Sequence, residues 1–144
     1  MSLQKYQRPP LFEQHGSAER RFLQLISALP KVSVQGYDKY RNVIYWNQSS
    51  EEMYGFKEYE AIGQKLEDLI IPSYMKSEVI RLHQQWIEQG ESIPSNELVL
   101  KKKNGDPIHV FSSHVMLKED TDSPEMYCVD IALSGQHAIR QELE

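Results

Sequence analysis

Cys128, His114 and Asp130 are residue types that could supply a nucleophile, a general base and an orienting acid. Cys128 and Asp130 lie two positions apart in a segment of strand character. Neither a glycine-rich turn nor a helix N-terminus stands beside the cysteine to activate its thiol. The sequence also offers no identifiable oxyanion donor. We therefore expect no catalytic residues and no enzymatic activity.

The histidines are the other candidates for chemistry. His109 and His114 are five positions apart on an expected strand, so they face opposite sides and lack the spacing of a metal site. His83 lies on the apolar face of an expected helix, and imidazole is a good ligand for haem iron. A single histidine on an apolar face is more often a hydrogen-bonded core residue. We expect no metal site and keep His83 as the one residue to consider as a haem ligand.

Composition limits the classes of function. The chain has 144 residues, the length of one ordinary domain, and a net charge of −5. This charge argues against a nucleic-acid surface, and the single basic run, Lys101 to Lys103, is expected at a solvated hairpin end. One cysteine excludes an internal disulfide, and no segment has the apolar length of a membrane span. We expect a cytoplasmic domain without direct membrane insertion, although a parent protein could be anchored elsewhere.

Periodicity divides the chain into four parts. Residues 1–16 read as a flexible arm, and residues 17–30 as an amphipathic helix with Ser17 as its N-cap and Pro30 at its end. Residues 31–133 form the core domain, and residues 134–144 are a polar tail that reads as the start of a linker.

Within the core, helices separate two groups of strands. Alternation predicts strands at 32–38 and 43–46, and Ser49 with Glu52 has the spacing of a capping box for a short helix that ends at Gly55. A longer helix is expected at 73–89, where Gly90 is a natural stop. Asn104-Gly105 predicts a type I′ turn between strands at 96–103 and 108–117, and a last strand follows at 127–133. This order favours an α+β fold, in which one antiparallel sheet is covered by helices on one face and can enclose a cavity.

Several short motifs follow one another over about 100 residues of the chain. They are Gly36-Tyr37-Asp38, Ile44 to Asn47, Glu52 to Phe56, Glu60 to Gly63, Leu69 to Pro72, Trp86 with Gly90, Lys103 to Gly105, and Val129 to Ile131. In this order the set resembles the PAS family of sensory domains, and the set is more specific than any single piece.

The resemblance implies a five-stranded antiparallel sheet in the order 2-1-5-4-3, helices on one face and an N-terminal flanking helix. It also implies a sensory or interaction module, most often bacterial, that works as a homodimer. Such a module binds a small ligand or a partner and relays the signal to an output domain of the parent protein, of the histidine kinase or diguanylate cyclase type. The alternative is a ligand-free dimerisation module with a packed core.

The resemblance also bears on cofactors. Flavin-binding relatives carry a reactive cysteine where this chain has Gly55-Phe56-Lys57, so photoadduct chemistry is not expected. In haem-binding relatives the axial histidine falls about one helical turn before His83, near Val79 or Ile80. The expected cofactor is therefore unknown, with none tightly bound, and a haem-based gas or redox sensor is the least favoured alternative.

By comparison with relatives, one face of the sheet and the facing helices line the cavity. Asn47 ends the second strand, and either contacts a ligand or holds the turn into the following helix. The candidate pocket residues are Asn47, Met53, Tyr54, Val79, Leu82, His83, Trp86, Leu98, Leu100, Val110, Ser112, His114, Met126 and Cys128.

The other face of the sheet is strongly apolar and needs a cover. We expect the N-terminal helix to supply it, from the same chain or from a partner subunit. The candidate dimer-interface residues are Phe22, Leu25, Ile26, Leu29, Phe111 and Val115.

The last strand ends in Asp130-Ile131-Ala132, where many relatives have Asp-Ile-Thr. The resemblance makes these three residues candidates for coupling the core to the linker. Ala132 lacks the hydroxyl group that threonine contributes, whereas Asp130 could still pair with a basic group such as Lys39 or Arg41.

Overall fold

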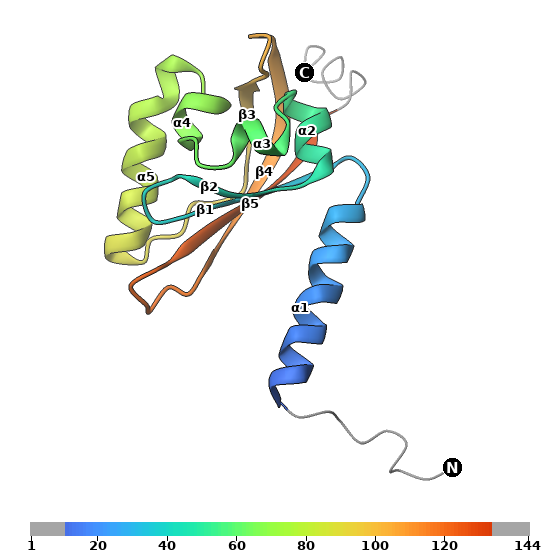
Figure 1. The fold of residues 1–144 in the computed structure, drawn as a ribbon. Helices are drawn as coiled ribbons and strands as arrows, with labels where there is room; N and C mark the ends of the chain where they lie inside the picture. Colours follow the sequence, from blue (N-terminus) through green and yellow to red (C-terminus); the bar gives the residue numbers. More distant parts are fainter. Residues whose placement is uncertain (1–10, 134–144) are drawn as a thin grey trace.

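The computed structural model describes residues 11–133 and contains one five-stranded antiparallel sheet with helices over one face (Figure 1). The strand order is β2-β1-β5-β4-β3, which confirms the predicted α+β architecture. The elements in chain order are α1 (Leu11–Ala28), β1 (Val32–Tyr37), β2 (Val43–Trp46), α2 (Gln48–Tyr54), α3 (Glu58–Ala61), α4 (Leu66–Leu69), the 3₁₀ turn η2 (Ser73–Met75), α5 (Lys76–Gln89), β3 (Asn96–Lys101), β4 (Pro107–Leu117) and β5 (Glu125–Ala132).

Helix α2 begins two residues earlier than the predicted capping box places it. Asn47 is the N-cap, because its side-chain oxygen accepts the backbone N–H of Ser50 at 2.9 Å. Ser49 instead donates its hydroxyl hydrogen to the carbonyl oxygen of Leu29. Gly55 ends the helix in the left-handed conformation, as expected.

The helix predicted over residues 73–89 is divided in two. The Met75 N–H bonds to the Pro72 carbonyl three residues back, which closes the 3₁₀ turn η2 before α5 begins at Lys76. Gly90 ends α5 in the left-handed conformation, as the sequence predicts.

The hairpin between β3 and β4 is confirmed, but its turn is of another type. The Gly105 N–H bonds to the carbonyl of Lys102, and Gly105 alone in this turn has a positive φ, of 91°. A type I′ turn would also need a positive φ at Asn104. The geometry is that of a type I turn followed by a left-handed residue, which produces a bulged hairpin.

Helix α1 begins at Leu11, so the predicted helix start at Ser17 and the flexible arm over residues 1–16 are wrong for residues 11–16. Gln14, His15 and Gly16 hide the helical periodicity there. Residues 1–10 of the predicted arm and the expected linker, residues 134–144, lie outside the described residues.

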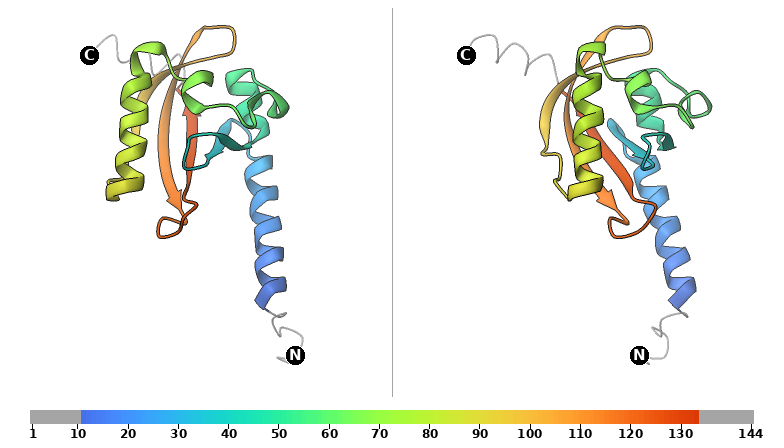
Figure 2. Two further views of the ribbon diagram at one scale, coloured as in Figure 1. Left: turned by 60° about the vertical axis from the view of Figure 1, so that its left-hand side comes forward. Right: turned by 90° about the vertical axis from the view of Figure 1, so that its left-hand side faces the viewer.

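Helix α1 projects away from the core rather than across the sheet of its own chain (Figures 1 and 2). Ile26 is its buried contact, whereas Phe22 and Leu25 are each 59% exposed. Phe111 and Val115, on the face of the sheet opposite the helices, are also largely exposed. Within one chain, therefore, α1 leaves much of this apolar face uncovered.

The main core lies between the other face of the sheet and helices α2, α4 and α5. Trp46 is buried at the end of β2 and donates its indole N–H to the carbonyl of Phe56 at 2.9 Å. Strand β1 was expected to be half-buried, but Ser33 through Tyr37 are buried on both faces. The Tyr127 ring packs against Gly36 on one face of β1, and Ser33 contacts Ser50 of α2 on the other, so both faces are covered.

Candidate ligand-binding cavity

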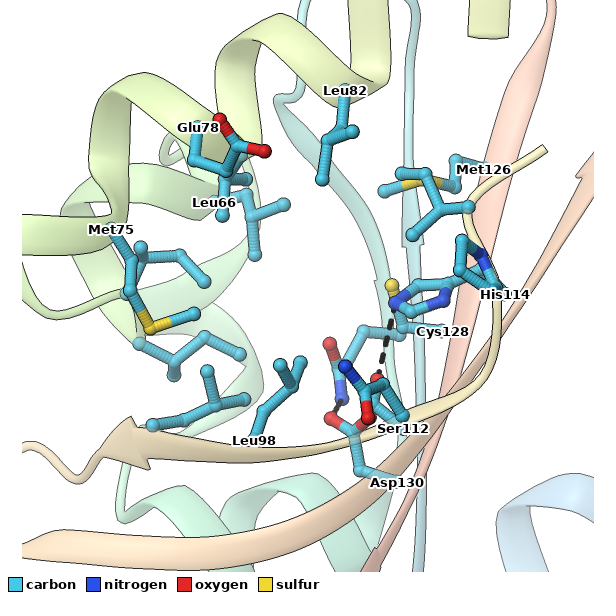
Figure 3. Close-up of a pocket in the computed structure, with 18 residues that line it drawn as sticks. Leu66, Met75, Glu78, Leu82, Leu98, Ser112, His114, Met126, Cys128 and Asp130 are labelled. Atoms are coloured by element: carbon cyan, nitrogen blue, oxygen red, sulfur yellow. Dashed lines mark hydrogen bonds between the residues drawn. The ribbon is translucent and has the colours of Figure 1, made fainter. Parts of the chain in front are cut away.

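A cavity of about 290 Å³ lies between the inner face of the sheet and the helical layer (Figure 3). Its size approaches the lower end of the range for small-molecule pockets. Most of the wall is apolar: Leu66, Met75 and Leu82 on the helical side face Leu98 and Met126 on the sheet. The interior therefore suits a small molecule with a mainly apolar body.

Polar groups gather on one part of the cavity wall because of the register of the strands. Asp130 on β5 pairs with Ser33 on β1 and with Ser112 on β4, and Ser112 pairs in turn with Asn96 on β3. Since paired residues point to the same face of a sheet, these four side chains form one row across four strands. We call Ser33, Asp130, Ser112 and Asn96 the polar row.

Asp130 is the buried acid of this row, with 1% of its surface exposed. Its Oδ2 accepts hydrogen bonds from Gln35 Nε2 at 2.6 Å and from the Tyr54 hydroxyl at 2.5 Å. Its Oδ1 is buried and has no hydrogen-bond partner among the described residues. One oxygen of the carboxylate is thus bonded to the protein, while the other has no partner among the described residues, on a side chain that lines the cavity.

A chain of buried hydrogen bonds runs from this carboxylate to helix α1. Gln35 Nε2 also donates to Ser33 Oγ at 2.7 Å, and Ser33 Oγ lies 2.7 Å from Ser50 Oγ. Ser50 Oγ donates to Asn47 Oδ1 at 2.8 Å. Asn47 Nδ2 then donates to the carbonyl of Ile26, in the last turn of α1, at 2.9 Å. We call this series, from Asp130 to Ile26, the buried polar chain.

Burial keeps the tyrosine, cysteine and histidine side chains at and beside the cavity in their neutral forms. It is the main cause that raises the pKa of Tyr37 and Tyr54 well above the usual value, with Asp130 adding to the effect, so both hydroxyls remain donors. Burial likewise raises the pKa of the Cys128 thiol. Burial also lowers the pKa of His114, although Asp130 and the Ile93 backbone oppose that shift. Among residues 11–133, therefore, no side chain that lines the cavity is cationic at neutral pH.

Fourteen residues were candidates for the pocket, and the structure brings part of this set together. Eight of them line the cavity: Val79, Leu82, Leu98, Leu100, Ser112, His114, Met126 and Cys128. The other six do not line it: Asn47, Met53, Tyr54, His83, Trp86 and Val110. Tyr54 is connected to the cavity through its hydrogen bond to Asp130. Asn47 caps α2 and so holds the turn, which is the second of the two roles predicted for it.

His83 faces a packed region rather than the cavity. It is 1% exposed, and burial is the main cause that lowers its pKa to about 4, with Arg41 adding to the effect. A haem iron ligand must face the space that the macrocycle occupies, so these residues do not fit haem in this cavity. In the part of the chain that the structure describes, no three metal-binding side chains are grouped together.

The suggested pairing of Asp130 with Lys39 or Arg41 is wrong. Arg41 pairs with Glu67, its Nε lying 3.0 Å from Glu67 Oε2, and the neighbours of Asp130 are uncharged. Sequence reasoning also missed cavity residues, among them Gln35, Leu66, Ile70, Met75 and Asn96. The register of β1 against β5 would have found Gln35, since it pairs with Cys128.

A family profile described as the PAS fold matches residues 43–130, more than half of the chain. The chain belongs to the PAS family. A search of curated proteins finds no match. None of the helices between residues 11 and 133 has both the length and the apolarity to cross a membrane.

Solved structures agree with this PAS assignment. A PAS domain from Colwellia psychrerythraea superposes with a TM-score of 0.67 at 19% identity, covering 81% of this chain and 97% of that one. The PAS domain of the Cronobacter turicensis quorum-sensing receptor RpfR, in complex with BDSF, gives 0.62 at 20% identity over 74% and 98%. The Escherichia coli DhaR(N)–DhaL complex gives 0.60 at 14% identity over 85% and 38%. At these identities the likeness establishes the fold.

Proposed function

We propose that this PAS domain is a sensor that binds a small molecule in the cavity and transmits its presence to helix α1. The observation that carries the proposal is the buried polar chain, since it joins Asp130, which lines the cavity, to the last turn of a projecting helix. The solved complex of the RpfR domain with BDSF supports a ligand-binding role for this fold.

The relay follows from the chemistry of the chain. Gln35 uses both amide hydrogens, one on Asp130 and one on Ser33, so a movement of Asp130 also displaces the donor to Ser33. Hydrogen bonds in such a series polarise one another, and a buried group that loses its partner is costly. A ligand that shifts Asp130 therefore biases the position of Asn47 and the carbonyl it holds on α1.

Strand β5 provides a second route by which the signal leaves the core. Asp130, Ile131 and Ala132 lead directly to the C-terminal end of the described chain, and Ile131 is 48% exposed. These residues couple the core to an output domain of the parent protein, of the histidine kinase or diguanylate cyclase type.

The transmitting unit is a homodimer in which α1 of one subunit covers the outer sheet face of its partner. Phe22 and Leu25 on α1 and Phe111 and Val115 on β4 are large, exposed and apolar, which is typical of an interaction surface. Ile26 is buried in its own chain, and Leu29 is partly buried, so they contribute less to a partner.

The dimer is tested with Phe22→Glu combined with Leu25→Glu. Two buried charges in the interface should convert a dimer to a monomer, measured as the mass in solution by light scattering. Arg20→Glu, also exposed on α1, is the matched control and should keep the dimer mass. An unchanged mass in the double variant would rule out the α1 interface.

Ligand binding is tested with native mass spectrometry and an absorption spectrum of fresh protein, then with a thermal-shift screen of small molecules. Leu98→Trp places an indole in the cavity and should abolish both any co-purified mass and any ligand-induced rise in Tm. Val99→Trp, the next residue on β3, points to the opposite face and should keep both. If no molecule binds wild type, the ligand-free dimerisation module replaces the sensor.

A further inference from the structure

We propose that the cavity selects a small amphipathic amine, with a cationic head on Asp130 Oδ1 and an apolar body between α5 and the sheet. This inference rests on the proposed ligand-binding function and names the class of molecule. It comes from Asp130 Oδ1, a buried carboxylate oxygen that has no donor among the described residues and belongs to a residue that lines the cavity.

The side chains that donate to Asp130 Oδ2 have no further hydrogen to give. Gln35 gives its two amide hydrogens to Ser33 and Asp130 Oδ2, and the Tyr54 hydroxyl gives its only hydrogen to the same Oδ2. Tyr37 donates to Gln35 Oε1 at 2.7 Å. The protein therefore fixes Oδ2 firmly and offers Oδ1 as an acceptor, so the group that completes the site must carry an N–H or O–H donor.

The charge of the site favours a cation among such donors. Asp130 is a buried acid, yet no lysine or arginine stands among the described residues that line the cavity. The other acid on the wall is Glu78 at the exposed surface, where it already pairs with Arg81. A buried carboxylate without a counter-ion is costly, and an ammonium group would supply both the missing donor and the missing charge.

The same charge argues against a carboxylate-headed ligand. Its head would meet the Asp130 carboxylate at the polar row, where like charges repel strongly in an apolar surrounding. His114 beside it is neutral, because burial lowers its pKa, and His114 Nε2 lies 3.2 Å from Ser112 Oγ. The part of the wall that the structure describes therefore has no cationic group that could receive an anion.

The rest of the cavity sets the size of the body. The volume of about 290 Å³ and the aliphatic wall around Leu66, Leu82 and Leu98 suit a chain or ring of a few carbon atoms. Figure 3 shows these leucines facing the space in front of Asp130 and Cys128.

The test compares 1-hexylamine, 1-hexanol and hexanoate, which share a six-carbon body and differ in the head. Binding to wild-type protein is measured by titration calorimetry at pH 7 and physiological salt. Hexylamine should bind about tenfold or more tightly than hexanol, since a charge-assisted hydrogen bond is roughly twice as strong as a neutral one. Hexanoate should bind more weakly than hexanol.

Asp130→Asn then inverts the preference. The asparagine oxygen can accept the bonds from Gln35 and Tyr54, which leaves its NH₂ group facing the cavity as a donor. Hexylamine should lose about tenfold or more in affinity, and hexanoate should gain relative to hexanol. Glu88→Gln, an exposed acid of α5 that does not line the cavity, is the control for general attraction to an acidic protein and should change hexylamine binding by less than about threefold.

The results distinguish failure of the amine class from failure of the ligand-binding function. Equal or tighter binding of hexanoate in wild type, or unchanged hexylamine binding in Asp130→Asn, overturns the amine class but leaves a ligand-binding cavity in place. If none of the three molecules binds wild type at millimolar concentration, the amine class is refuted, while the thermal-shift screen decides separately on the sensor function.

Discussion

The two ends of the buried polar chain differ in how completely their polar atoms are paired. Asn47 donates both amide hydrogens, to the carbonyls of Ile26 and Val32, and its Oδ1 accepts from the N–H groups of Val34 and Ser50. Asp130 has one satisfied oxygen and one without a partner among the described residues. The Asn47 end is therefore structural, because all of its side-chain polar atoms are bonded. The Asp130 end needs a further hydrogen-bond donor to be complete.

Asn47→Ala should have the largest effect on stability. It removes the N-cap of α2 and leaves the backbone N–H of Val34 and two carbonyls without their partner in a buried region. Each lost buried partner costs about 1–3 kcal/mol, so a loss of about 4 kcal/mol in the free energy of unfolding is expected.

Urea denaturation measures this loss, with Gln48→Ala as the neighbouring exposed control, for which a change below about 0.5 kcal/mol is expected. Amide hydrogen exchange in the last turn of α1 should also rise in Asn47→Ala. A cost no larger than that of the control would mean that the paired end is not the structural one.

Substitutions at Asp130 should separate its two oxygens. Asp130→Ala removes the acceptor for Gln35 and Tyr54 together and should lower the free energy of unfolding by about 2–3 kcal/mol. Asp130→Asn keeps one accepting oxygen and removes an uncompensated buried charge, so its cost should stay below about 1 kcal/mol. Denaturant unfolding of both variants gives the comparison.

The opposite outcome at Asp130 is equally informative. If asparagine proved as costly as alanine, the negative charge would be paired inside the protein, and the two ends of the chain would no longer differ in kind.

The sequence predicted which side chains of the sheet point to the helices more reliably than it predicted which residues line the cavity. The two-residue period fixes which side chains of β3, β4 and β5 point to the helices, and Leu98, His114 and Cys128 are where that period puts them. Gln35 could not be found in the same way, because β1 is buried on both faces and its polar positions look solvent-facing in the sequence.

Contacts between distant segments were beyond sequence reasoning. The pairing of Asp130 with Tyr54 joins residues 76 positions apart, and the competing suggestion, Arg41, is taken by Glu67. Which acid meets which donor depends on the packing of α2 and α4 against the sheet. A pattern of residue types does not contain that information.

The smallest effect is expected at His83, which can be compared with Asp130 in its hydrogen bonding and in its position. Both of its ring nitrogens are without a hydrogen-bond partner in the described part of the chain, but it does not line the cavity. Burial and then Arg41 lower its pKa to about 4, while Glu67 and Asp38 act in the opposite direction. Since the unfolded chain binds this proton near pH 6.5, the stability contribution is complete above pH 6.5 and is lost as the pH falls toward 4.

Wild-type protein should therefore lose about 1–2 kcal/mol of stability from this histidine between pH 7 and pH 5, the range allowing for partial solvent screening. His83→Gln should remove that part of the pH dependence, and the exposed-site variant His109→Gln should keep it. Saturating hexylamine should raise stability at both pH values without changing this difference, because an unpaired group away from the cavity has no ligand to respond to. The opposite result would be that hexylamine changes the loss of stability on acidification in wild type but not in His83→Gln. His83 would then respond to the ligand without lining the cavity, so being buried and unpaired would matter more than lying at the cavity.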